Sequence, residues 1–365
     1  MSRIGLYCPE LPPVRGGVAD HTLVLARALA AGGADVAVLG RRGDAAAFAP
    51  IPCRTGVSHR GGRGGLAAAC EALGVRALLV QYVPFLFARW GLAPALVGSL
   101  ASLAHAGVRV GLLVHEPWVP PTRAVWRLTG PLMRRQLFAL VARADAVLSP
   151  VPGFLERVRP AARPGVPCEL VPVGSTIPVV PADRAAVRAS LGLGDGDVAV
   201  GVFSPGAAGL LTDWLARAAR GGVRNAVWVY FGAGSERGPE GLPADLRVLR
   251  LGWLPPERVS AVLQALDLAV APYADGLTLR RTGAMAALAH GSALAGSRGP
   301  LFDPALEGAA ALADSAGAFA EAVRALVADP GARSALAARG RAFYRERGSV
   351  EVLAARVAAV LGEAA

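Results

Sequence analysis

Short apolar runs alternate with longer stretches of helical periodicity along the chain. In the first half, the runs have the length of buried strands, and the stretches between them have the length and periodicity of helices. This alternation is typical of parallel sheets whose strands are joined by crossover helices. The predicted strands are residues 4–7, 35–39, 77–82, 108–114 and 146–149, and the predicted helices are 18–31, 65–73, 85–105 and 121–143.

The same alternation starts again in the second half of the chain. A stretch rich in proline and small residues, 171–181, predicts a hinge between two doubly wound α/β domains. The length of 365 residues also favours two domains, because one hydrophobic core rarely supports so long a chain. The second series of strands is predicted at 169–173, 198–203, 226–231, 246–249, 268–271 and 293–295, with helices beginning near Asp183, Gly209, Pro256, Arg281 and Ser315.

Composition and charge narrow the classes of function. Hydrophobic residues make up 53% of the chain and charged residues 18%, which excludes a disordered protein. The net charge of +11 indicates an anionic partner such as a nucleotide, a phospholipid surface or a polyanion. No run of like charge is long enough for a nucleic-acid-binding arm. All 38 basic residues are arginine, so a Walker-type phosphate loop and a lysine Schiff base are both excluded.

The cysteines and the N-terminus predict a cytoplasmic protein. Cys8, Cys53, Cys70 and Cys168 are far apart, so neither a disulfide framework nor a zinc site is expected. The chain starts directly with a strand-like segment rather than a signal peptide. The uncharged run 90–108 is long enough to raise the question of a membrane span, but it contains a proline and three glycines. We therefore expect a buried amphipathic helix there.

A doubly basic turn at residues 275–291, DGLTLRRTGAMAALAHG, runs into a helix of small residues. The first amides of a helix lack partners within the helix, and Arg280 and Arg281 add charged donors at the same place. Arginines at a helix start oppose the helix dipole, so an anion should compensate them. A phosphate ligand or a nearby carboxylate would serve, and a simple solvated basic turn is the alternative interpretation.

Two loops in the first half have the position of binding loops. In doubly wound sheets, ligands bind beyond the carboxyl ends of the strands. Gly16 and Gly17 lie between the first strand and the first helix, where glycines let a ligand approach the backbone amides, although no dinucleotide fingerprint is present. His115 and Glu116 follow a strand directly and could transfer protons or bind a ligand hydroxyl, or else only cap the loop. The other histidines lack such placement.

Two turns in the second half carry weaker signals. Ser204 and Gly206 lie in a strand-to-helix turn that offers backbone amides but no charge. Gly252 and Trp253 follow a strand and precede a helix, and an ordinary helix cap would explain both. These turns alone would not indicate a ligand.

Together, these motifs resemble the retaining GT-B glycosyltransferases of family 4, also called glycosyl transferases group 1, of which the chain would be a divergent member. The resemblance covers nearly the whole chain. It rests on Gly16-Gly17-Val18, on His115-Glu116, on the segments 143–147 and 252–272, and above all on 275–291. The family's acidic motif has two glutamates eight positions apart, and Asp275 and Gly283 occupy those positions here.

The resemblance implies a GT-B fold with two Rossmann-like domains facing each other across a cleft. They would comprise residues 1–172 and 173–344, with a C-terminal helix, 345–365, that crosses back to the first. The donor would be a nucleotide-diphosphate sugar of the UDP or GDP type, transferred with retention and without metal or cofactor. The implied catalytic residues are His115 and Asp275; the donor and phosphate residues are Gly16, Gly17, Val18, Ser204, Gly206, Gly252, Trp253, Gly276, Leu277, Thr278, Leu279, Arg280, Arg281, Thr282 and Gly283; and the acceptor-side residues are Asp20, Glu116 and Trp118.

The sequence departs from this family pattern at two places. Gly283 replaces a glutamate that in the family contacts the ribose, and the basic pair expected after Phe203 is missing. We expect Arg280 and Arg281 to compensate. A catalytically inactive glycosyltransferase-like partner or scaffold remains the alternative, whereas the absent fingerprint disfavours a dehydrogenase. The acceptor stays open among a glycan, a lipid-linked molecule and a small molecule, and peripheral contact of 121–143 with the inner membrane face is compatible with the charge.

Overall fold

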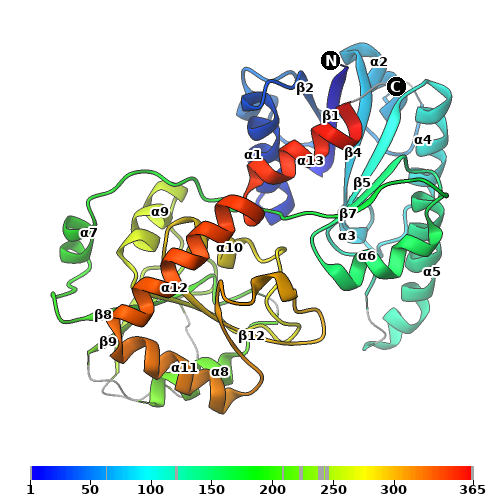
Figure 1. Cartoon of the computed structure of the whole chain (residues 1–365). Helices are drawn as coiled ribbons and strands as arrows, with labels where there is room; N and C mark the ends of the chain where they lie inside the picture. Colours follow the sequence, from blue (N-terminus) through cyan, green and yellow to red (C-terminus); the bar gives the residue numbers. More distant parts are fainter. Residues whose placement is uncertain are drawn as a thin grey trace. The chain divides into compact units, whose positions relative to one another are not determined.

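The computed structural model describes residues 2–62, 64–119, 122–207, 209–221, 225–236, 242 and 246–362. The chain forms two compact units, Met1–Val173 together with Val350–Ala365, and Gly174–Ser349. Each unit contains a parallel sheet with helices packed on it (Figure 1). In the described part of the chain, no helix combines the length and the apolar character needed to cross a membrane.

The first unit contains a seven-stranded sheet in the order β3-β2-β1-β4-β5-β6-β7. All neighbouring strands are parallel. The strand order reverses between β1 and β4, so the carboxyl ends of these strands, Glu10 and Tyr82, mark the usual ligand position of a doubly wound sheet. The strands are β1 Arg3–Glu10, β2 Val36–Arg42, β3 Cys53–Arg54, β4 Val75–Tyr82, β5 Arg109–Val114, β6 Ala146–Ser149 and β7 Cys168–Leu170.

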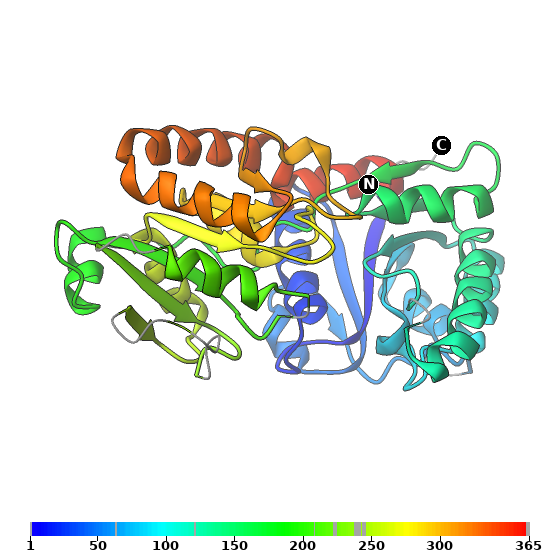
Figure 2. The ribbon, with the colours of Figure 1, turned by 90° about the horizontal axis from the view of Figure 1, so that it is seen from below.

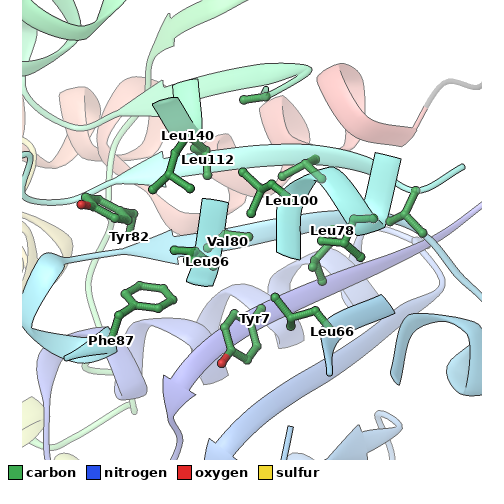
Figure 3. Packing of buried hydrophobic residues seen from close by; sticks show 14 of the residues in the cluster. Tyr7, Leu66, Leu78, Val80, Tyr82, Phe87, Leu96, Leu100, Leu112 and Leu140 are labelled. Carbon is green, nitrogen blue, oxygen red and sulfur yellow. The ribbon is translucent and has the colours of Figure 1, made fainter. Parts of the chain in front are cut away.

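Helices cover both faces of this sheet. On one face, α2, α4 and α5 enclose a core that contains Tyr7, Val80 and Leu112 (Figure 3). On the other face, α1 and the C-terminal α13 pack over Ile4 and Leu6. The helices are α1 Gly17–Ala31, α2 Leu66–Leu73, α3 Pro84–Phe87, α4 Pro94–His105, α5 Ala124–Val141, α6 Pro152–Val158 and α13 Val350–Gly362.

The structure corrects four of the predictions for the first unit. The expected helix 85–105 is two helices, α3 and α4, because Gly91 adopts a left-handed conformation and Pro94 starts a new helix. The expected helix 121–143 begins at Ala124, and residue 121 lies outside the described residues. The strand predicted at 169–173 is β7, which belongs to the first sheet rather than to the second series, and β3 was not predicted.

The second unit contains a six-stranded parallel sheet in the order β10-β9-β8-β11-β12-β13. Its strand order reverses between β8 and β11. The strands are β8 Val198–Phe203, β9 Ala226–Phe231, β10 Arg247–Arg250, β11 Leu268–Ala271, β12 Ala293–Ser297 and β13 Ala311–Ala313, and the helices are α7 Arg184–Ser190, α8 Thr212–Arg220, α9 Pro256–Ala265, α10 Thr282–Ala289, α11 Ala316–Ala328 and α12 Pro330–Phe343.

The helices of the second unit also lie on both faces of their sheet. One buried cluster joins α9 and α10 to the sheet through Leu263 and Met285, and the other joins α8 and α11 through Leu215 and Phe319. Figure 2 shows α11 and α12 running side by side, as their packing contacts require. A short π-helical segment, Tyr344–Gly348, follows α12. The predicted helical tail 332–361 is therefore interrupted, and β13 was not predicted.

Candidate functional site

The loops after β8 and β11 are hydrogen-bonded to each other at the strand-order reversal of the second unit. The amide of Leu211 donates to the Pro272 carbonyl at 2.9 Å, and the amide of Ala274 donates to the Gly209 carbonyl at 2.7 Å. Leu210 and Tyr273 form an antiparallel bridge between the same two loops. The basic turn therefore begins at the position where doubly wound sheets usually bind ligands.

Asp275 provides a carboxylate to both arginines of the basic turn. Arg280 Nη2 lies 2.6 Å from Asp275 Oδ2, and Arg281 Nη2 contacts Asp275 Oδ1. The guanidinium of Arg281 also lies 3.9 Å from the centroid of the Tyr273 ring, a cation–π contact. The three charged side chains are largely buried, with exposed fractions of 26% for Asp275, 17% for Arg280 and 15% for Arg281. A nearby carboxylate thus compensates the charge of both arginines.

The loop that follows β12 packs against the backbone of the basic turn. A Cβ on Gly276, which has φ 91°, would lie 2.7 Å from the Gly299 amide nitrogen, so the two backbones are in direct contact. The backbone carbonyl of Asp275 accepts from the Leu301 amide at 2.8 Å, and the backbone carbonyl of Leu277 accepts from the Asp303 amide at 3.0 Å. This support fixes the backbone of the turn.

Four of the residues predicted to bind the donor, Gly276 to Leu279, are buried inside the second unit. Leu277 and Thr278 have no exposed surface, and Leu279 is 4% exposed. Leu277 and Leu279 belong to the apolar core. Thr278 Oγ1 is buried without a hydrogen-bond partner among the described residues. The structure therefore leaves Asp275, Arg280, Arg281 and Thr282 partly exposed on this unit.

Gly283 packs against an aromatic ring. A Cβ at Gly283 would lie 3.1 Å from Cδ1 of Phe203, which is closer than ordinary van der Waals contact. The Phe203 ring stacks on Phe231 with 5.1 Å between centroids, and Gly232 lies close to its other edge. A glutamate at position 283 would therefore require the Phe203 ring to move. Phe203 thus takes part of the space that a side chain at position 283 would enter.

The turns after β8, β9 and β10 are tied together by backbone hydrogen bonds. Gly206 donates to Ala233 at 3.0 Å, and Gly232 donates to Gly252 at 2.8 Å. Ser204 has φ 50°, the only positive value for a described residue other than glycine, and such a conformation often marks functional sites. Trp253 is 57% exposed. These hydrogen bonds thus bring Ser204, Gly206 and Gly252 together in one group of loops.

In the first unit, the glycines at the start of α1 are exposed. A Cβ added to Gly16 or Gly17 would meet no atom within 4 Å, so packing within the protein does not require glycine at either position. Val18 and Asp20 follow in the first turn, and Asp20 is exposed. The open space above the helix amides agrees with the predicted approach of a ligand.

His115 is a buried member of a polar group that sequence reasoning did not detect. Its ring is 5% exposed, and its Nε2 lies 2.6 Å from Oε1 of the fully buried Gln81. A ring nitrogen that faces an amide oxygen carries the hydrogen of this contact. The His21 ring contacts the His115 ring edge-to-face, with 5.1 Å between centroids. His21 thus lies beside the predicted catalytic histidine.

Burial also sets the charge of His21. Loss of water around the ring lowers the pKa of His21 from 6.5 to about 4, and the nearby Gln81 and Val173 offset this only in part. His21 is therefore neutral at physiological pH. A signal for its burial was present in the sequence, because His21 shares a helical face with Leu25, Ala26 and Leu29, all buried.

Glu116 and Trp118, which were predicted on the acceptor side, lie in different surroundings from His115. Glu116 is exposed, and Trp118 packs on Phe138 of α5 with 6.2 Å between ring centroids. Among the described residues, no group of three or more His, Cys, Asp and Glu side chains could hold a metal ion. All four cysteines are free.

The fold is similar to that of known glycosyltransferases. Sucrose-phosphate synthase from Thermosynechococcus elongatus matches with a TM-score of 0.70 and 19% identity over 99% of this chain and 98% of that protein. HepE of Anabaena, solved in complex with UDP, matches with a TM-score of 0.69 and 15% identity over 98% and 99%. A glycosyltransferase from Rickettsia africae gives 0.69 and 11% over 98% and 97%.

These likenesses establish the architecture. No protein-family model matches the sequence, and no curated protein is similar to it. The chain has the two-unit α/β fold of GT-B glycosyltransferases, as predicted from its motifs.

Proposed function

We propose that this protein is a glycosyltransferase that moves a sugar from a nucleotide diphosphate to an acceptor, with retention and without a metal ion. The observation that carries the proposal is the likeness over the whole chain to glycosyltransferases, of which HepE was solved with UDP and with UDP-glucose. The basic turn after β11 supports it, since it places two guanidiniums at the strand-order reversal of the second unit.

In this proposal, the arginines stabilise the leaving group. Transfer breaks the bond between the sugar C1 and the diphosphate oxygen, C1 bonds to the acceptor oxygen, and the acceptor hydroxyl gives its proton to the departing diphosphate oxygen. Negative charge grows on the departing diphosphate. Arg280 and Arg281 donate to that charge in place of a metal ion, and the first amides of α10 add to the effect.

The Asp275 carboxylate would compete with a bound diphosphate for the two arginines. Its carboxylate contacts both guanidiniums, so an incoming diphosphate must displace or share it. Once displaced, Asp275 is available to accept hydrogen bonds from donor-sugar hydroxyls, which is the role implied for it by the family pattern. His115, held by Gln81 at 2.6 Å from its Nε2, is the histidine that we expect to assist transfer.

Calorimetry with UDP, GDP and their glucose and mannose derivatives tests the proposal. Arg280→Ala/Arg281→Ala should weaken nucleotide-sugar binding at least about tenfold, because each charge-assisted contact contributes roughly 1.5 to 3 kcal/mol. Arg324→Ala/Arg339→Ala removes the same charge from exposed positions of the second unit and should leave binding unchanged. Equal affinity of wild type and the Arg280/Arg281 variant would overturn the phosphate assignment.

A non-catalytic glycosyltransferase-like partner protein is the second candidate. It is favoured by Gly283, which offers no carboxylate to a ribose and lies so close to Phe203 that an added Cβ would be 3.1 Å from Cδ1 of the ring. The two candidates differ in one measurement. A wild-type protein that binds none of the nucleotides and hydrolyses none of the nucleotide sugars would reject sugar transfer and support the partner role.

A further inference from the structure

The outward face of α5 in the first unit carries an apolar stripe. Val125, Leu128 and Leu132 are exposed by 39%, 74% and 52%, although they occur three and four positions apart as a buried stripe would. The opposite face of the helix is already buried through Met133, Leu137 and other residues. Figures 1 and 2 both show α5 along an edge of the first unit. The packing of α5 on the first unit therefore does not explain the exposed stripe.

Between Glu116 and Asp145, the charged residues of this part of the chain are all arginine. The segment 117–144 contains Arg123, Arg127, Arg134, Arg135 and Arg143 but no aspartate or glutamate. The first four of these arginines are exposed. The face thus combines apolar side chains with charge of one sign, and an acidic surface would be complementary to it.

Aromatic rings hold several of these guanidiniums beside the apolar surface. Arg123 lies 4.5 Å from the Trp126 ring centroid, and Arg134 lies 5.1 Å from that of Phe138. Between them, Trp118, Pro131 and neighbouring residues line an open hollow of about 510 Å³. Paired tryptophan and arginine side chains suit the boundary between headgroups and acyl chains, because each pair presents both an apolar and a charged surface.

A neighbouring loop extends the same surface. Gln136 of α5 accepts from the Ala93 amide at 2.6 Å and donates to the Gly91 carbonyl at 3.3 Å, which fixes residues 88–93 on the helix. Trp90 in this loop is 55% exposed, with the Arg89 guanidinium 5.3 Å from its ring centroid. We call α5 and this loop together the α5 face.

We propose that the α5 face docks on an anionic phospholipid bilayer, with Leu128 and Leu132 entering the interface and the arginines contacting headgroup phosphates. Charge complementarity selects this occupant. A second copy of the chain would bring arginine against arginine on a two-fold axis, which like-charge repulsion opposes. The inference does not depend on the proposed sugar transfer.

Vesicle sedimentation of the full chain tests this proposal. The protein should bind vesicles of phosphatidylcholine mixed with phosphatidylglycerol at least about tenfold more tightly than phosphatidylcholine alone, and added salt should weaken that binding. Leu128→Ser/Leu132→Ser should reduce binding about tenfold or more without unfolding the protein, because both side chains are exposed. Val179→Ser/Val180→Ser, at exposed apolar positions of the second unit, is the matched control and should bind like wild type.

Three outcomes would overturn the proposal. Wild type that binds neither kind of vesicle would reject a membrane partner. Equal binding by the Leu128/Leu132 variant and the control would reject the α5 face. Wild type that forms dimers by light scattering, with dimers lost only in the Leu128/Leu132 variant and no vesicle binding, would identify a second copy as the occupant.

Discussion

His21 should make the stability of the first unit depend on pH between about 4 and 6.5. Burial lowers the pKa of its ring to about 4 in the folded chain, against 6.5 in water. Above pH 6.5 the ring is neutral in both states, and its contribution to stability is fully present. As pH falls, the unfolded chain takes up the proton first, and stability is lost until the folded ring is protonated as well. The difference between the two pKa values corresponds to about 3 kcal/mol at or below pH 4.

Two variants isolate this effect. His21→Leu removes the titrating ring, so the unfolding free energy of wild type relative to this variant should fall by about 3 kcal/mol from pH 7 to pH 4. Leu25→Ala lies on the same helix and is also fully buried. It should lower stability by about 2 to 5 kcal/mol at every pH, because a cavity does not titrate.

Urea unfolding followed by circular dichroism at a series of pH values is the measurement. The transition that Leu25→Ala moves identifies the first unit, since the two units need not unfold together. Parallel stability curves for wild type and His21→Leu across this pH range would refute the reasoning. Parallel curves would mean that water reaches the His21 ring in the folded chain, or that the buried ring keeps its proton.

Four further predictions concern the site and its surroundings. His115→Ala should lower kcat more than it weakens donor binding, measured by steady-state kinetics beside calorimetry; equal kcat would make His115 a structural residue. Asp275→Asn should tighten UDP binding up to about tenfold, since the competing charge is gone; weaker UDP binding would contradict that competition. Chelators should leave transfer rates unchanged, and complete loss would reveal a metal. Burial raises the pKa of Asp303, so its folded form favours the neutral carboxyl and the chain loses stability as pH rises; Asp303→Asn should stabilise the second unit at pH 7 but not at pH 3 in urea titrations.

The fold was predictable wherever a strand is long and apolar. β6, β8, β9 and β11 have the predicted bounds, because each is a continuous apolar run between polar or glycine-bearing turns. β3 and β13 contain only two and three residues, too few to show a periodicity. The missed break between α3 and α4 depends on one left-handed glycine inside an apolar stretch, where hydrophobic pattern does not distinguish a helix from a loop.

The site was predictable only where its residues are close in sequence. Asp275 stands five and six positions before its arginines, and a compensating carboxylate was one of the two expected anions. His21, Gln81 and His115 come from three different elements, and tertiary packing alone brings them together. The contact of Phe203 with Gly283 likewise joins the end of a strand to a helix far along the chain. The roles of these residues in binding and catalysis remain predictions.

The contact between Phe203 and Gly283 couples two positions that lie far apart in the sequence. The Cβ of any residue introduced at 283 would lie 3.1 Å from Cδ1 of Phe203, so the ring would have to shift by a few tenths of an ångström. A smaller residue at 203 would leave room for that Cβ without adding a functional group. We therefore expect substitutions at the two positions to be non-additive, with a glutamate at 283 better tolerated once residue 203 is small.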